Sequence, residues 1–67
     1  MGKPKDMPVR YVVLHDNGEG YVSYSTKLKD AFSYARQTAS RYHGEIFEGH
    51  ETSEGPVLLP VKSYRRD

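Results

Sequence analysis

The chain of 67 residues carries a formal net charge of +1, and 36% of its residues are hydrophobic. It contains no cysteine, which excludes disulfides and every zinc or iron–sulfur site built on thiolates. It also lacks a run of about 18 apolar residues, so the sequence predicts no membrane-spanning helix. We expect one small cytoplasmic domain with a modest core, to which the six tyrosines add buried area.

The first part of the chain predicts a β-hairpin. Residues 1–8 hold two prolines and a glycine and are expected to form a flexible N-terminal arm. Residues 9–15 are rich in β-branched and aromatic side chains, which favours a strand. Asn17-Gly18 is a pair preferred in two-residue hairpin turns, and residues 21–25 predict the returning strand.

A helix over residues 26–43 is predicted next. Ser25 or Thr26 is expected to cap its first turn through a side-chain oxygen, and Gly44 to end it in a left-handed conformation. Apolar residues recur at helical spacing and form one stripe. The stripe consists of Leu28, Ala31, Phe32, Ala35, Ala39 and Tyr42.

Two further strands follow the helix. Residues 45–51 predict a third strand, whose glutamates favour a position at the edge of the sheet. Residues 57–62 predict a fourth strand, which Pro60 restricts to an edge or to partial pairing. Residues 63–67 are expected to form a basic C-terminal tail.

The order of the elements predicts an α+β fold of ββαββ order, a single domain over residues 9–62. One helix should pack on one face of a mainly antiparallel sheet. In the first hairpin Val13 is expected to face Val22, and Tyr11 to face Tyr24, on the side that receives the helix. The sequence leaves open whether the third strand pairs with the first strand or only with the fourth.

The opposite face of the first hairpin carries more apolar side chains than a face in water needs. It presents Arg10, Val12, Leu14, Tyr21 and Ser23. We expect the C-terminal segment, a second copy of the chain or a different protein to cover it. An arginine and an aromatic residue beside apolar side chains are typical of interface anchors. Arg10, Val12, Leu14 and Tyr21 are therefore the candidate partner-binding residues.

Little in the sequence points to catalysis or to a metal. Glu48 and His50 share one face of the predicted third strand, but no third ligand stands at a suitable spacing. Residues 16–20 match neither a calcium loop nor a phosphate loop. No nucleophile and base stand in a recognisable motif. We expect no catalytic residues, no metal, no cofactor and no enzyme activity.

Basic residues near the end of the chain make nucleic-acid binding the second hypothesis. Lys62, Tyr64, Arg65 and Arg66 combine positive charge with an aromatic ring that can stack on unpaired bases of RNA or single-stranded DNA. The sequence pI of about 8.0 is low for a phosphate-driven binder, and the helix shows no single basic face. A homodimeric structural protein is the third hypothesis.

No family is recognisable from individual residues. The order of a hairpin, an alanine-bearing helix and further strands, over residues 9–50, resembles that of small phage-encoded inhibitors such as anti-CRISPR proteins and inhibitors of bacterial RNA polymerase. The resemblance lies in element order, size and lack of cysteine. The leading expectation is a non-catalytic binding module of bacterial or phage origin that occupies a host protein surface. In one version, the glutamates of residues 45–54 pair with a basic groove on the partner.

Overall fold

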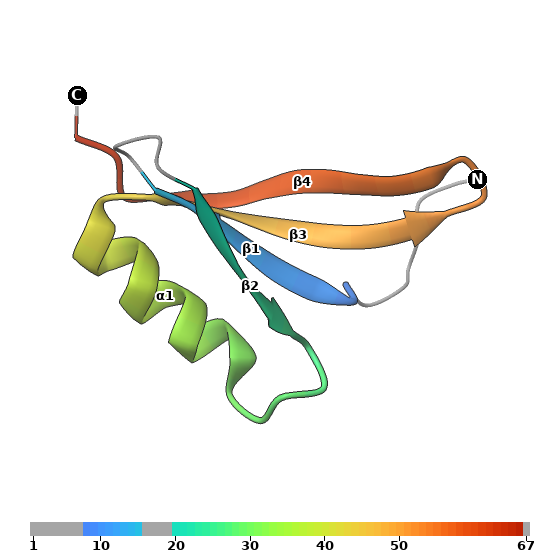
Figure 1. The fold of residues 1–67 in the computed structure, drawn as a ribbon, viewed down its shortest axis with the longest axis horizontal. Coiled ribbons are helices and arrows are strands. Elements are labelled where there is room, and N and C mark those ends of the chain that lie inside the picture. Colours follow the sequence, from blue (N-terminus) through green and yellow to red (C-terminus); the bar gives the residue numbers. More distant parts are fainter. Residues whose placement is uncertain (1–7, 16–19, 67) are drawn as a thin grey trace.

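The computed structural model describes residues 8–15 and 20–66. The elements are β1 (Arg10–Leu14), β2 (Tyr21–Ser25), α1 (Ala31–Tyr42), β3 (Glu45–Thr52) and β4 (Gly55–Ser63). The strands form one antiparallel sheet in the order β2-β1-β3-β4, and α1 packs on one of its faces (Figure 1). The predicted α+β class and ββαββ order are confirmed, and β3 pairs with both β1 and β4.

The first hairpin has the register that its alternating side chains predict. Val13 pairs with Val22, and Tyr11 pairs with Tyr24. The predicted Asn17-Gly18 turn lies outside the described residues.

The helix begins five residues later than its predicted start at residue 26, which is therefore wrong. The Ser25 hydroxyl accepts a hydrogen bond from the Lys27 N–H (3.1 Å), and the Ser25 carbonyl accepts one from the Leu28 N–H (3.0 Å). These two bonds hold a turn ahead of α1 rather than its first helical turn. Leu28 consequently lies outside the helix with 45% of its surface exposed.

At the other end of α1, the left-handed residue is His43 (φ 54°) and not the expected Gly44. The Gly44 N–H donates to the Ala39 carbonyl at 2.8 Å. Glycine is required there for a different reason, because a Cβ would run into the Leu14 carbonyl oxygen. The small residue lets the chain leave the helix directly beside β1.

The core lies between α1 and the sheet. Val13, Ala35, Ala39 and Ile46 are completely buried, and the two alanines let the helix approach the strands closely. Larger side chains close the core around them. They are Tyr11, Tyr24, Phe32 and Tyr64.

β3 lies between β1 and β4, so the expected edge position of the third strand is wrong. Its glutamates are tolerated in a central strand because each has a basic neighbour. The pairs are Glu48 with His50 (2.9 Å), Glu51 with Arg10 (3.4 Å) and Glu45 with Arg65 (4.0 Å). β4, which contains Pro60, is an edge strand as predicted.

Replacing Ile46 by alanine should lower the free energy of unfolding by about 3 kcal/mol, because the loss of a fully buried side chain leaves a cavity. The control is Leu59→Ala on β4, where the leucine is 45% exposed and the expected loss is below about 1 kcal/mol. Urea unfolding followed by circular dichroism measures both values. Equal losses would contradict this description of the core.

Candidate protein-binding face and a basic groove

The sheet face opposite α1, called here the open face, carries the predicted partner-binding residues. Arg10, Val12 and Leu14 alternate along β1, and Tyr21 of β2 pairs with Leu14. Side chains at alternate positions share a face, as do those of paired residues. Together with Ser23 and Leu58, these four residues line one depression of about 400 Å³. The structure therefore brings the whole predicted set together.

The C-terminal segment does not cover the open face, so that expected arrangement is wrong for the described residues. β4 is a strand of the same sheet, and Tyr64 packs against the core on the helix side. Leu14, Leu58 and Tyr21 are 39%, 49% and 65% exposed, respectively, whereas Val12 between them is only 6% exposed. In the part of the chain that the structure describes, this face has no second layer.

Arg10 lies along the floor of the open face rather than projecting from it. Its side chain crosses the paired residue Gly49, where an added Cβ would stand 2.6 Å from the Arg10 Cγ. The Arg10 Nη2 lies 3.4 Å from the Glu51 Oε2. Both side chains are exposed, so this ion pair orients the guanidinium but contributes little stability.

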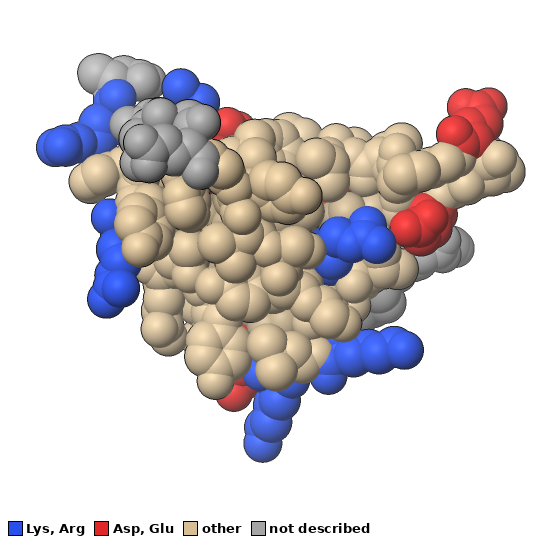
Figure 2. Space-filling view, viewed as in Figure 1, with Lys and Arg blue, Asp and Glu red and all other residues tan. Residues whose placement is uncertain are grey.

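A second depression, the basic groove, lies between α1 and the residue after β4. It has a volume of about 540 Å³. Its lining consists of Ser33, Arg36, Gln37, Ser40, Arg41 and Tyr64. The Lys62 Nζ lies 5.2 Å from the centre of the Tyr64 ring and adds a third cation. Figure 2 shows Lys and Arg side chains at this end of the molecule, and others at the bottom and right of the view.

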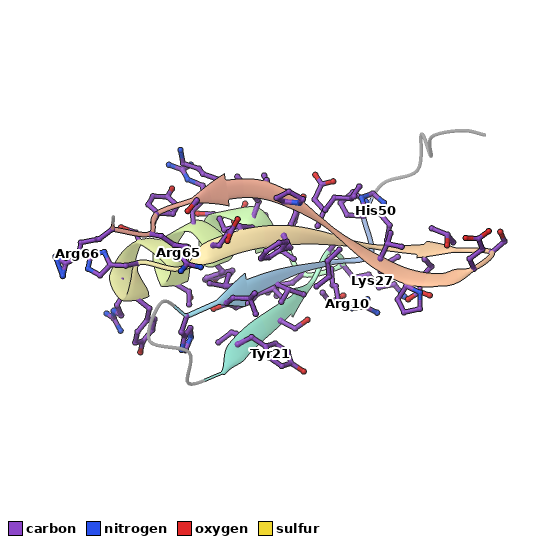
Figure 3. All side chains as sticks on the ribbon, turned by 90° about the horizontal axis from the view of Figure 1, so that it is seen from above. Arg10, Tyr21, Lys27, His50, Arg65 and Arg66 are labelled. Atoms are coloured by element: carbon purple, nitrogen blue, oxygen red, sulfur yellow. The ribbon has the colours of Figure 1, made fainter. Side chains whose placement is uncertain are left out.

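The structure separates the four residues predicted to bind nucleic acid. Lys62 and Tyr64 lie together at the basic groove. Arg65 turns toward Glu45, with 4.0 Å between Nη1 and Oε1, and Arg66 extends beyond it at the end of the molecule (Figure 3). Arg36 and Arg41 were not predicted as part of this site, because Tyr64, which completes the groove with them, is distant from both in the chain.

The glutamates of residues 45–54 do not form one acidic surface. Glu48 lies on the helix side of β3, whereas Glu45 and Glu51 lie on the open face. Glu54 stands in the β3–β4 turn. The glutamates therefore do not share one face through which they could pair with a basic groove on a partner.

Among the described residues, Glu48 and His50 form a contact between a histidine and a carboxylate. Its nitrogen and oxygen lie 2.9 Å apart, and His50 is only 6% exposed. Within residues 8–15 and 20–66, no three such side chains gather as metal ligands. Over the same residues, no helix is long and apolar enough to cross a membrane.

The chain matches no protein-family model, no curated protein and no solved structure. The function is therefore inferred from the two depressions, on the open face and at the basic groove.

Gly49→Ala should displace the Arg10 side chain, because the new methyl group would occupy the space of its Cγ. The expected result is a shift of the Arg10 Nε–Hε resonance in a ¹⁵N NMR spectrum and loss of the contact with Glu51. Ser23→Ala, which also changes the open face, is the control and should leave that resonance in place. An unchanged Arg10 resonance in Gly49→Ala would show that the side chain does not lie across the glycine.

Proposed function

We propose that the chain is a non-catalytic protein-binding module whose partner covers the open face. The observation that carries the proposal is the single depression lined by the four predicted residues together with Ser23 and Leu58. An uncovered apolar face on a small domain is typical of an interaction site.

The proposed contact combines apolar anchoring with polar orientation. Leu14, Tyr21 and Leu58 offer the partner exposed apolar surface around the depression, and its burial supplies affinity. Tyr21 and Arg10 are the residue types that most often dominate interface energies. The paired Arg10 and Glu51 at one side fix the orientation of the partner.

In its finer form, the proposal is an inhibitor that acts by occupying a host protein surface. The resemblance in element order to small phage-encoded inhibitors supports this form. Such an activity needs no catalytic group, only a surface that a competing partner would otherwise contact.

Leu14→Glu should abolish partner binding, because it places a charge in the apolar depression. The matched control is Leu59→Glu, since Leu59 is similarly exposed (45% against 39%) but lies on the helix side of the sheet. Tagged variants are used to capture partners from nuclease-treated lysate of the source cells, with mass spectrometry as the readout.

A partner recovered with the wild type and Leu59→Glu, but not with Leu14→Glu, would support the open face as its binding site. Equal recovery with both variants would exclude that face. Circular dichroism checks that both variants are folded.

Binding of RNA or single-stranded DNA is the second candidate function, favoured by the basic groove. Two arginines, a tyrosine and two serine hydroxyls line it, and none of its lining residues among residues 8–15 and 20–66 is acidic. Arginine is suited to phosphate oxygens, and a tyrosine ring to an unpaired base.

The double variant Arg36→Gln/Arg41→Gln should weaken binding of a fluorescent oligo(U) or oligo(dT). Loss of two phosphate contacts should also reduce the slope of log affinity against log salt by about 1.4. Lys27→Gln/Lys29→Gln is the control with the same change in charge, and Lys27 lies well away from Arg66 along the molecule (Figure 3). Fluorescence anisotropy measures the binding. An equal effect of both double variants would indicate attraction by overall charge and exclude the groove.

A further inference from the structure

We propose that the chain forms a homodimer in which β2 pairs antiparallel with β2 of a second copy. The inference goes beyond the proposed function, and rests on the backbone of β2 and on the depressions at either side of it. Figure 3 shows β2 as the outer strand of the sheet, with Tyr21 projecting from it.

The backbone groups on the free edge of β2 follow from its pairing with β1. The His15 N–H donates to the Gly20 carbonyl (3.1 Å), and the Thr26 N–H donates to the Val9 carbonyl (3.2 Å). Hydrogen-bonded and non-hydrogen-bonded pairs alternate along an antiparallel ladder. The residues whose N–H and C=O groups point away from β1 are therefore Tyr21, Ser23 and Ser25.

This edge is open in the described part of the chain. The backbone groups of Tyr21 and Ser23 on that side have no hydrogen-bond partner among residues 8–15 and 20–66, and only the Ser25 carbonyl accepts a bond there, from the Leu28 N–H. Unpaired groups in a row are a template for another strand.

The opposite edge of the sheet is closed to such pairing. Thr52 and Gly55 flank a two-residue turn and form its hydrogen-bonded pair. By alternation, the outward-pointing positions of β4 include Pro56, Leu58 and Pro60. Two of these three lack an N–H, so this stretch of β4 offers an added strand a single donor. β2 contains no proline.

Depressions on both sides of β2 provide a second, independent observation. On the open face, Tyr21 and Ser23 line the depression of about 400 Å³. On the helix side, Val22 and Tyr24 line another of about 330 Å³, together with residues of α1. The side chains of an added strand alternate between the two faces of the sheet, so each depression can receive some of them.

A second copy of β2 fits this edge because the strand is complementary to itself. A two-fold axis at Ser23 pairs the two Ser23 residues with each other, and Tyr21 with Ser25 of the other copy. The outward N–H and C=O groups of the two Ser23 residues then pair with each other, as an interface between identical copies requires. The Ser25 N–H can donate to the Tyr21 carbonyl of the other copy, while the Ser25 carbonyl keeps its bond from the Leu28 N–H. Val22 and Tyr24 supply apolar side chains to the helix-side depressions.

Dimerisation would also meet the energetic need of a small domain. A chain of 67 residues without cysteine has a small core and no disulfide to support it. Pairing would bury part of Tyr21, which is 65% exposed. It would also join the open faces of the two copies into one continuous surface.

The first test introduces one cysteine, Ser23→Cys, into the cysteine-free chain. Cα atoms in a hydrogen-bonded antiparallel pair lie about 5.5 Å apart, which is within the range of a disulfide. Mild oxidation at about 10 µM protein should link the copies at least about ten-fold faster than in Ser40→Cys, an exposed control on α1. Equal rates would overturn the proposal.

The second test measures the dimer of the full chain by sedimentation equilibrium. Ser23→Pro removes one outward N–H from each copy and should raise the dissociation constant about thirty-fold, from two lost hydrogen bonds. Leu58→Pro makes the same change on the edge formed by β4 and should leave the dissociation constant unchanged. β4 already holds prolines at such positions, so Leu58→Pro should fold. The Ser23 N–H points away from β1, so Ser23→Pro removes no hydrogen bond between β2 and β1, and circular dichroism checks the fold of both variants.

A wild-type chain that stays monomeric up to about 1 mM, where even a weak dimer would form, would overturn the proposal. Such a result would point to an extended peptide of another protein as the occupant of the edge. A dimer that survives Ser23→Pro but not Leu58→Pro would also overturn it. If Ser23→Pro fails to fold, the oxidation rates of Ser23→Cys and Ser40→Cys decide whether the dimer proposal stands, and equal rates overturn it.

Discussion

One helix can cover only one face of a sheet, and the arrangement of this molecule depends on that constraint. α1 packs over β1 and β2 and buries Ile46 of β3. The opposite face keeps Leu14, Tyr21 and Leu58 exposed, and most of β4 lies farther from the helix than β1 and β2 do (Figure 1). Because a single helix covers one face of the sheet, the other face remains available for binding.

Much of the fold could be predicted because the signals were local. The two-residue period of the first hairpin determined which side chains share a face, so the register of Tyr11 with Tyr24 followed. The same period identified the residues of the open face before their depression was known. The start of α1 was missed because Asp30, directly before it, adopts a left-handed conformation (φ 63°) that a continuous helix over residues 26–43 cannot contain.

The remaining differences come from contacts between distant parts of the chain. The central position of β3 brings Glu51 beside Arg10, which is 41 residues away in the chain. Leu58 joins the open-face depression only through the β3–β4 register. Tyr64 likewise completes the basic groove after β4 has returned along the sheet. Patterns among residues that are close in the sequence do not indicate such contacts between residues that are far apart in it.

The prolines of β4 have a consequence for solubility and assembly. A sheet that is open at both edges can add further chains without limit, which leads to fibres. Here Pro56 and Pro60 remove donors from one edge, although Val57, Leu58, Leu59 and Val61 of the same strand are exposed. Growth by strand addition can therefore proceed from one side only, and an assembly built through that side stops after a single step.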